Sequence, residues 1–471
     1  KQAGKSTQAA LWSKYRGALT VNGDRAVIRL EGGGVRAYGS AFCGSSGIAL
    51  DESAPVKAIV LLGQASENTV TPVPAPEAFR ELLGKMTYDT SVQSSVEAAA
   101  EPMISRYLNA RCASFGIPAS ATFELTSACN FNCKMCYIHS AGASRCGELS
   151  TEQWISLGRQ AQELGVIFLL ITGGEPLSRP DFPEIYTALK RMGFVISINT
   201  NGSLLGDRIT RLFEELPPTR LNISLYGADN GAYGSLCGAP AFEKVIANIR
   251  RMQDIGVDVK INCSVTPDNC GDIERLCRLT ADMGLNMKLT TYMYPPVRRD
   301  AGSVGSNPAR FTPEQAAYYR VKYSLLTLGE EEFLRRADNL NAFFDSESEC
   351  VDDIEAERGV RCRAGRSALW VDRLGNVNPC GMINGESRNA LELGLAECWR
   401  EVREATAEIR TPAECVNCKL RPLCPVCAAA CKCETGRFDL APKYLCEMSE
   451  YTARFIAERA DEIRSEKHED Q

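Results

Sequence analysis

Three cysteines lie within eight residues of this chain, at Cys129, Cys133 and Cys136, in the spacing C-x3-C-x2-C. A closed structural metal site uses four protein ligands, and this short loop supplies three. Three thiolates on one loop therefore favour an iron–sulfur cluster that keeps one coordination position open for a substrate or cofactor. A zinc knuckle, or a group of cysteines without a metal, is the alternative for this spacing taken alone.

The chain has 471 residues with 21 cysteines, two histidines and a formal net charge of −6. Cysteines in C-x2-C-type spacings within a large chain favour thiolate metal ligation in a reducing compartment over a disulfide framework, which predicts a cytoplasmic location. The charge gives no indication of a nucleic-acid partner. No run of about 18 apolar residues occurs, so we expect no membrane span.

The first residues of the chain match part of a phosphate-binding motif. The match to the back half of a P-loop consists of Gly4, Lys5, Ser6 and Thr7, and we expect its leading glycine and strand to fall before Lys1. With the blocks at 21–25 and 38–46, residues 1–95 resemble the small α/β nucleotide-binding domain of HPr kinase and phosphoenolpyruvate carboxykinase. The resemblance implies ATP and Mg²⁺ as ligands, with Asp24 in an Mg²⁺ or base role. A truncated kinase-like domain, an active one, and a structural module with a chance motif all stay open.

Between residues 118 and 300, short apolar segments alternate with amphipathic helical ones. We expect six strands, at 121–125, 166–172, 195–200, 221–225, 258–265 and 286–291. This alternation is typical of parallel strands with helical crossovers. A closed eight-fold barrel needs about 250 residues, so the region predicts an α/β fold with an open, partial (β/α)6 barrel of the TIM type. Its chemistry should lie at the carboxyl ends of the strands.

The second expected strand ends in Gly173, Gly174, Glu175 and Pro176. Glycines permit close backbone approach, and a glutamate can accept hydrogen bonds from an ammonium group. With the cysteine loop, this segment resembles the radical S-adenosylmethionine (radical SAM) enzymes. The resemblance implies a [4Fe–4S] cluster on the three loop cysteines, whose free iron binds S-adenosylmethionine. It also implies a low-potential electron donor such as flavodoxin or ferredoxin, and reductive cleavage of the cofactor to a 5′-deoxyadenosyl radical.

The same resemblance implies further cofactor contacts. The glycine segment would bind the methionine amino group of the cofactor. Asn201 and Ser224, at the ends of the third and fourth expected strands, would contact its ribose and carboxylate, although strand-end caps are the alternative for both. Tyr137 would pack on the adenine or belong to the core. Cys237 is expected in a loop after the fourth strand, near the barrel mouth.

Residues 301–349 predict a helical linker, with a helix that opens at Thr312 and Pro313. Residues 350–450 then hold a second cysteine set without a nearby histidine, and sulfur-only ligation suits iron–sulfur clusters or zinc. A hairpin over 368–378 would bring Cys362 and Cys380 together. Residues 451–471 predict a C-terminal helix and tail.

The C-terminal spacing resembles the SPASM extension of radical SAM enzymes, which holds two auxiliary [4Fe–4S] clusters. By this resemblance one cluster is held by Cys415, Cys418, Cys424 and Cys446. The other is held by Cys362, Cys380 and Cys427. Its fourth ligand stays open between Cys350, Cys431, Cys433 and an unoccupied position, because Cys431 and Cys433 depart from the family spacing.

The radical SAM and SPASM resemblance covers residues 120–450 and implies an enzyme that modifies a ribosomally made peptide or protein. The change would be a crosslink, a thioether, an epimerisation or a similar oxidation. Two other functions stay open: an ATP-dependent kinase-like protein with structural or redox-sensing clusters, and a non-catalytic module that binds a peptide.

Overall fold

A computed structural model describes residues 27–31, 34–38, 53–55, 103–138, 147–345, 359–383 and 388–469. The chain divides into two compact units, Lys1–Tyr88 and Asp89–Gln471. In the first unit, β1 (Val27–Glu31), β2 (Gly34–Tyr38) and β3 (Ser53–Pro55) form an antiparallel sheet in that order. The predicted P-loop residues Gly4, Lys5, Ser6 and Thr7, and also Asp24, lie outside the described residues.

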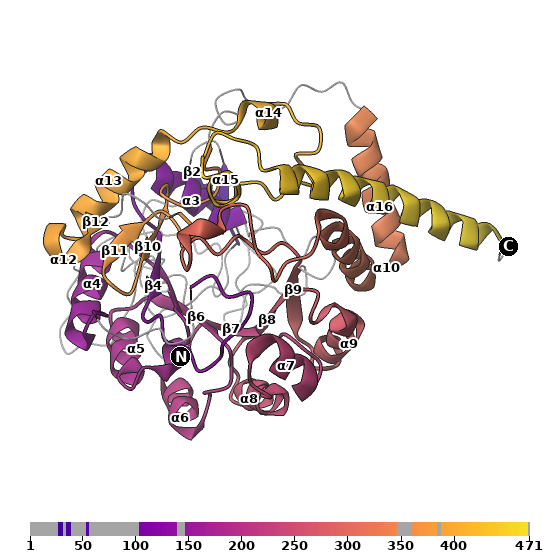
Figure 1. Cartoon of the computed structure of the whole chain (residues 1–471). Helices are drawn as coiled ribbons and strands as arrows, with labels where there is room; N and C mark the ends of the chain where they lie inside the picture. Colours follow the sequence, from indigo (N-terminus) through magenta and orange to yellow (C-terminus); the bar gives the residue numbers. More distant parts are fainter. Residues whose placement is uncertain are drawn as a thin grey trace. The chain divides into compact units, whose positions relative to one another are not determined.

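The second unit is built on one sheet with the strand order β12-β11-β10-β4-β5-β6-β7-β8-β9 (Figure 1). Its six consecutive parallel strands are β4 (Ser120–Glu124), β5 (Phe168–Thr172), β6 (Val195–Thr200), β7 (Arg220–Ser224), β8 (Val259–Ser264) and β9 (Asn286–Thr290). All six expected strands are present, with ends that differ by two residues or fewer. Among the described strands β9 and β12 do not pair, so the barrel is open and the predicted fold class is confirmed.

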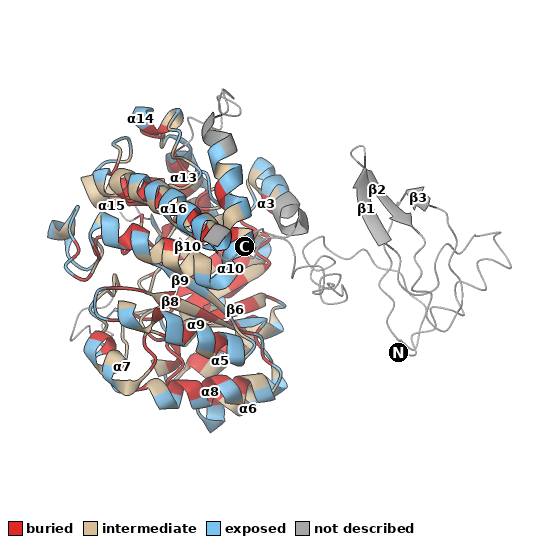
Figure 2. Cartoon of the chain, turned by 90° about the vertical axis from the view of Figure 1, so that its right-hand side faces the viewer, coloured by how far each residue is buried: buried red, intermediate tan, exposed pale blue. Residues whose placement is uncertain are grey.

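Helices connect these strands and cover the outer face of the sheet (Figure 1). They are α4 (Thr151–Glu163), α5 (Phe182–Arg191), α6 (Asp207–Glu215), α7 (Asn230–Cys237), α8 (Phe242–Asp254) and α9 (Ile273–Asp282). A capping box of Ser150 and Gln153 starts α4. The core lies between these helices and the sheet (Figure 2), where Trp154 packs against Phe123 with ring centroids 5.1 Å apart. Full burial of one such side chain contributes about 1.5–3 kcal/mol.

Helix α7 corrects the prediction for Cys237, which was expected in a loop. Asp229 caps the helix by accepting a hydrogen bond from the Ala232 N–H, and Gly238 ends it with φ +71°. The helix has eight residues, three of them Gly or Ser, so its helix propensity is low. Tertiary packing of the buried Tyr233 and Leu236 stabilises it instead.

The C-terminal cysteine region contributes strands to the barrel sheet. Strands β10 (Ala368–Val371) and β11 (Asn376–Asn378) form the expected hairpin, and β12 (Arg388–Asn389) follows. Strand β10 also pairs in parallel with β4, from Ala368 opposite Ser120 to Val371 opposite Phe123. This pairing covers the free edge of β4, the strand that leads into the cysteine loop.

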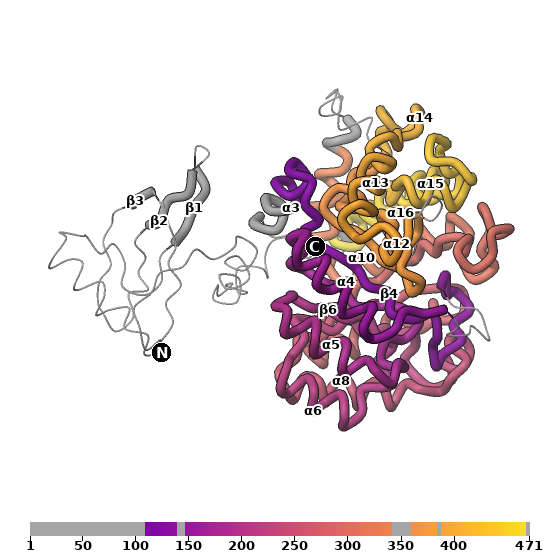
Figure 3. The backbone as a smooth tube through the Cα atoms, turned by 90° about the vertical axis from the view of Figure 1, so that its left-hand side faces the viewer, coloured from indigo at the N-terminus to yellow at the C-terminus, as the bar shows by residue number. Residues whose placement is uncertain are grey.

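The remaining helices complete the second unit. They are α3 (Met103–Phe115), α10 (Pro313–Asp345), α12 (Ala390–Leu393), α13 (Leu395–Ala407), α14 (Ala413–Val416), α15 (Ala428–Thr435) and α16 (Lys443–Glu469). The expected helix start at Thr312 is confirmed, since its hydroxyl accepts from the Gln315 N–H at 3.2 Å. Gly329, with φ +73°, kinks α10. Helices α10 and α16 pack together beside the barrel (Figure 1), on the side of this unit that is turned away from the viewer in Figure 3. No described helix is long and apolar enough to cross a membrane.

Candidate functional site

The cysteine loop begins at the carboxyl end of β4. Its three cysteines are partly buried, and Phe131 anchors the loop by packing edge-on against Tyr233 of α7. The Phe131 N–H donates a hydrogen bond to Cys129 Sγ at 3.4 Å. Burial raises the pKa of Cys129 to about 12, so the thiol is protonated at neutral pH and a metal must displace its proton.

Helix α7 supports the middle of this loop. The N–H groups of Asn132 and Lys134 donate to the carbonyl oxygens of Cys237 and Leu236, at 2.9 and 3.0 Å. The Cys237 side chain neighbours that of Cys133, and its interaction with the Cys133 thiol, together with burial, raises the pKa of Cys133. Cys237 is fully buried. A fourth thiol therefore lies directly against one of the three loop cysteines.

Gly173 and Gly174 contact the start of the cysteine loop. The Gly174 N–H donates to Thr126 O at 2.7 Å, and the Glu175 N–H donates to Ala128 O at 2.8 Å. A Cβ atom would lie 2.5 Å from Thr126 O if added to Gly173, and 2.4 Å from Ala128 O if added to Gly174. Glycine is therefore required at both positions, and the close backbone approach that it allows is to the loop itself.

Glu175 joins the ends of β5 and β6. Its Oε1 accepts from the Thr200 hydroxyl at 2.8 Å and from the Leu177 N–H at 3.1 Å, while its Oε2 accepts from the Asn201 N–H at 2.7 Å. Burial outweighs these bonds and raises the pKa of Glu175 to about 7. The carboxylate thus has three internal donors, and the expected contact with an ammonium group stays a prediction.

The side chain of Asn201 reaches the cysteine loop. Its Nδ2 donates to Asn130 Oδ1 at 2.9 Å and lies 3.8 Å from Cys129 Sγ, while its Oδ1 accepts from the Ser203 N–H. Asn130 donates in turn to the Ser203 hydroxyl at 2.9 Å. This network fixes the first loop cysteine relative to the end of β6.

Two other expected cofactor contacts lie at the same end of the sheet. Ser224 ends β7, and its Oγ accepts from the Tyr226 hydroxyl at 3.1 Å. Tyr137 follows the last loop cysteine, with the Arg298 guanidinium carbon 5.9 Å from its ring centroid. Both side chains therefore have protein partners, and the predicted contacts with ribose and adenine stay predictions.

An ion pair below the loop was missed by the sequence analysis. Glu124, the last residue of β4, is fully buried and binds Arg298 through two hydrogen bonds of 2.9 and 3.0 Å. Trp370 of β10 donates its indole N–H to the same carboxylate at 3.0 Å, and Arg298 also donates to Gly381 O. The available signal was an acidic residue at the end of a strand expected in the core of the sheet, because a buried carboxylate needs a partner.

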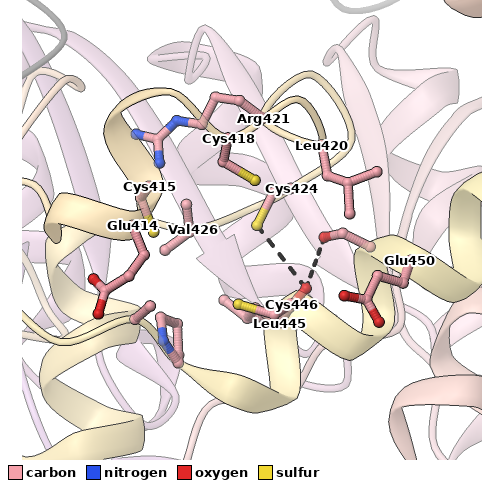
Figure 4. A pocket seen from close by; sticks show the side chains of 13 residues that line it. Glu414, Cys415, Cys418, Leu420, Arg421, Cys424, Val426, Leu445, Cys446 and Glu450 are labelled. Atoms are coloured by element: carbon pink, nitrogen blue, oxygen red, sulfur yellow. Dashed lines mark hydrogen bonds between the residues drawn. The ribbon is translucent and has the colours of Figure 1, made fainter. Parts of the chain in front are cut away.

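Four C-terminal cysteines line one cavity of about 160 Å³ (Figure 4). Cys415 lies in α14, Cys418 and Cys424 follow it, and Cys446 lies in the first turn of α16. Burial raises the pKa of Cys415 to about 11, and the charge of Cys446 adds to the rise. These are the four residues that the SPASM resemblance assigns to one cluster.

The second predicted set also lies together. Burial raises the pKa of Cys380 to about 11, and nearby Cys427 and Cys362 raise it further. Cys427 accepts from the Ala430 N–H at 3.4 Å, and its sulfur is 3.6 Å from the Tyr294 hydroxyl. Cys350 lies outside the described residues.

These sets offer sulfur as the only ligand atom, and backbone N–H groups donate to the sulfur atoms of Cys129 and Cys427. Sulfur-only ligation suits iron–sulfur clusters. Within the described ranges, no three or more His, Cys, Asp or Glu side chains converge as the ligands of a single metal ion do. A four-iron cluster is larger than one ion and spaces its thiolates farther apart.

Residues 123–280 match the family model described as the Radical SAM superfamily. The chain carries a radical SAM domain. The protein is accordingly an enzyme of the radical SAM type, and this domain implies a [4Fe–4S] cluster and S-adenosylmethionine. The match lies outside residues 1–95, so the predicted HPr kinase-like resemblance gains no support from it.

Similar proteins extend the comparison beyond the radical SAM domain. The chain is 26% identical over 337 residues to an AdoMet-dependent heme synthase of Methanosarcina barkeri, covering 68% of this chain and 94% of that protein. It is 25% identical over 327 residues to a PqqA peptide cyclase of Streptomyces rochei, covering 68% and 85%. Its fold resembles Streptococcus suis SuiB bound to precursor peptide SuiA, with a TM-score of 0.56, 16% identity and coverage of 91% and 99%.

Proposed function

We propose that this radical SAM enzyme modifies a ribosomally made peptide or protein. The name of the PqqA peptide cyclase relative supports a peptide substrate. The likeness to SuiB, which was solved with a precursor peptide, adds support through its fold alone. The bond that is formed or changed is a crosslink, a thioether, an epimerisation or a similar oxidation.

In this proposal Cys129, Cys133 and Cys136 hold the cluster that binds S-adenosylmethionine. The observation that carries it is the contact of Asn201 with the cysteine loop, because this contact joins the loop to the strand ends where a cofactor would lie. The part of the cofactor site next to this loop is formed by Gly173, Gly174, Glu175 and Pro176. When bound, the cluster supplies the electron that cleaves S-adenosylmethionine to a radical able to abstract hydrogen. A low-potential donor such as flavodoxin or ferredoxin would reduce the cluster beforehand.

The C-terminal cysteines hold two auxiliary [4Fe–4S] clusters in this proposal. The cavity lined by Cys415, Cys418, Cys424 and Cys446 supports the first, since its walls are otherwise mostly apolar and four thiols face it (Figure 4). The proximity of Cys380 to Cys362 and Cys427 supports the second. Pairing of β10 with β4 connects this region directly to the strand below the cysteine loop.

The test is anaerobic reconstitution followed by reduction with dithionite in the presence of S-adenosylmethionine. We expect 5′-deoxyadenosine, and we expect none from a Cys133→Ala variant. Peptides encoded beside the gene are then added, and mass spectrometry records a change in peptide mass. Wild-type protein that is fully loaded with iron and releases no 5′-deoxyadenosine would contradict the proposed chemistry.

A role in heme synthesis is the second candidate. The relative from Methanosarcina barkeri, an AdoMet-dependent heme synthase, matches over 94% of its own length and favours it. Release of 5′-deoxyadenosine above background with heme precursors, but not with peptides, would select this role over peptide modification.

A further inference from the structure

Helix α15 carries two cysteines that fit neither predicted set, Cys431 and Cys433. Both are buried, with 1% and 0% of their surface exposed. Residues two apart on a helix point about 200° away from each other. The two thiols therefore point to different sides of the helix.

Cys433 faces the turn that carries Cys380. Its sulfur lies 3.8 Å from Met382 O, and the turn is closed by the Ile383 N–H, which donates to Cys380 O at 3.3 Å. Burial raises the pKa of Cys433 to about 12, and the charges of Cys427 and Cys380 add to the rise. Cys433 therefore lies beside the turn that carries one member of the second cysteine set.

Tyr294 lies beside this group, since its hydroxyl is 3.6 Å from Cys427 Sγ.

Cys431 lies near Cys415 of the other set. Burial raises its pKa to about 12, and the neighbouring thiols Cys415 and Cys427 raise it further, Cys415 more strongly than Cys427. Cys415 belongs to the cavity that four cysteines already line. A cluster in that cavity has its four thiolates without Cys431.

We propose that Cys433 is the fourth protein ligand of the second auxiliary cluster, beside Cys362, Cys380 and Cys427. The inference rests on the proposed function, which supplies the cluster. Four-iron clusters are commonly held by four thiolates, and Cys433 is the described cysteine beyond the family spacing whose sulfur lies against the Cys380 turn. With this ligand the second auxiliary cluster has no position left for a substrate, and its role is electron transfer.

The test compares Cys433→Ala with Cys431→Ala, two buried positions on the same helix. Each protein is reconstituted anaerobically with iron and sulfide, and iron content and the electron paramagnetic resonance (EPR) spectrum are measured. Wild type should hold about twelve irons in three clusters. Cys433→Ala should lose between about one and four of these irons, with a three-iron signal if one iron leaves, while Cys431→Ala should keep wild-type iron and spectrum.

A Cys433→Ala variant that keeps all its irons and the wild-type spectrum overturns the inference, as does loss of iron from Cys431→Ala alone. If Cys433→Ala does not fold, Cys433→Ser decides: a changed EPR spectrum at full iron content supports ligation, and an unchanged one contradicts it. If wild-type protein held only about four irons, the result would instead show that the auxiliary clusters are absent. Failure of the proposed function is therefore distinguishable from failure of the ligand assignment.

Discussion

Arg298 binds Glu124 through two parallel hydrogen bonds of 2.9 and 3.0 Å in a place almost closed to water, where the arginine side chain is 10% exposed and the carboxylate 0%. Glu124 ends the strand that leads into the cysteine loop, and Arg298 also binds Gly381 O next to Cys380. The pair therefore joins the loop to the turn that carries the second cysteine set. It connects two proposed cluster sites through protein contacts that do not depend on iron.

Removing one partner of this pair should be strongly destabilising. Glu124→Gln leaves the Arg298 charge buried without its partner, which costs about 3–5 kcal/mol. Urea unfolding under anaerobic conditions measures the loss. Arg299→Ala is the control, because Arg299 makes an exposed bond to Cys136 O and its removal should cost about 0.5 kcal/mol or less. Equal losses in the two variants would contradict a buried, paired carboxylate.

Gly174→Ala should displace the cysteine loop while the barrel stays folded. The added Cβ would stand 2.4 Å from Ala128 O, a backbone atom that cannot move without moving the loop. We expect the variant to lose most of the iron of the loop cluster and nearly all production of 5′-deoxyadenosine. Circular dichroism checks the fold. Gly271→Ala is the matched control, since a Cβ atom added at Gly271 would have nothing within 4 Å. If this variant also lost iron, the effect of Gly174→Ala would not come from a specific contact with the loop.

The strands of the barrel could be predicted from the sequence, because their apolar pattern is local. The contacts between residues far apart in the chain could not be predicted. Six strands were found within two residues of their ends because each is an apolar run between turn signals. Helix α7 was missed because its glycines and serine hide a helix that packing stabilises. The hairpin of β10 and β11 was expected, but its pairing with β4 joins residues more than two hundred positions apart, and no local pattern records that.

Site prediction followed the same division. The SPASM resemblance grouped Cys415, Cys418, Cys424 and Cys446, and all four line one cavity, because three of them are close in sequence and the fourth lies in the first turn of a helix that packs beside them. Their role as the ligands of one cluster stays a prediction. Spacing could not assign Cys431 or Cys433 to a cluster, since the direction of each side chain depends on where a short helix begins. Glu124 and Arg298 are likewise recognisable as a pair only once β4 and the 295–300 loop are placed in space.

The raised pKa of Glu175 predicts a pH-dependent contribution to stability. Burial raises this pKa to about 7 in the folded protein, above the unfolded value of about 4.3. The protonated form therefore stabilises the folded state below about pH 4.3, and this stabilisation is lost as pH rises through about 7. Relative to Glu175→Gln, which does not titrate, wild type should lose about 2–3 kcal/mol of unfolding free energy between about pH 5 and pH 8. Parallel pH profiles of wild type and variant in urea unfolding would show that Glu175 does not titrate in this range.

The contact of Cys237 with Cys133 predicts that Cys237 raises the reduction potential of the loop cluster. A thiol that donates a hydrogen bond to a ligating sulfur stabilises the more negative, reduced cluster and raises its reduction potential. Cys237→Ala should therefore lower the potential of the loop cluster by on the order of 50 mV, the equivalent of one hydrogen bond of about 1 kcal/mol. An EPR-monitored redox titration measures the shift. Cys263→Ala, which removes another buried thiol from β8, is the control and should leave the potential unchanged. Equal potentials in Cys237→Ala and wild type would mean that the Cys237 thiol does not donate to the cluster.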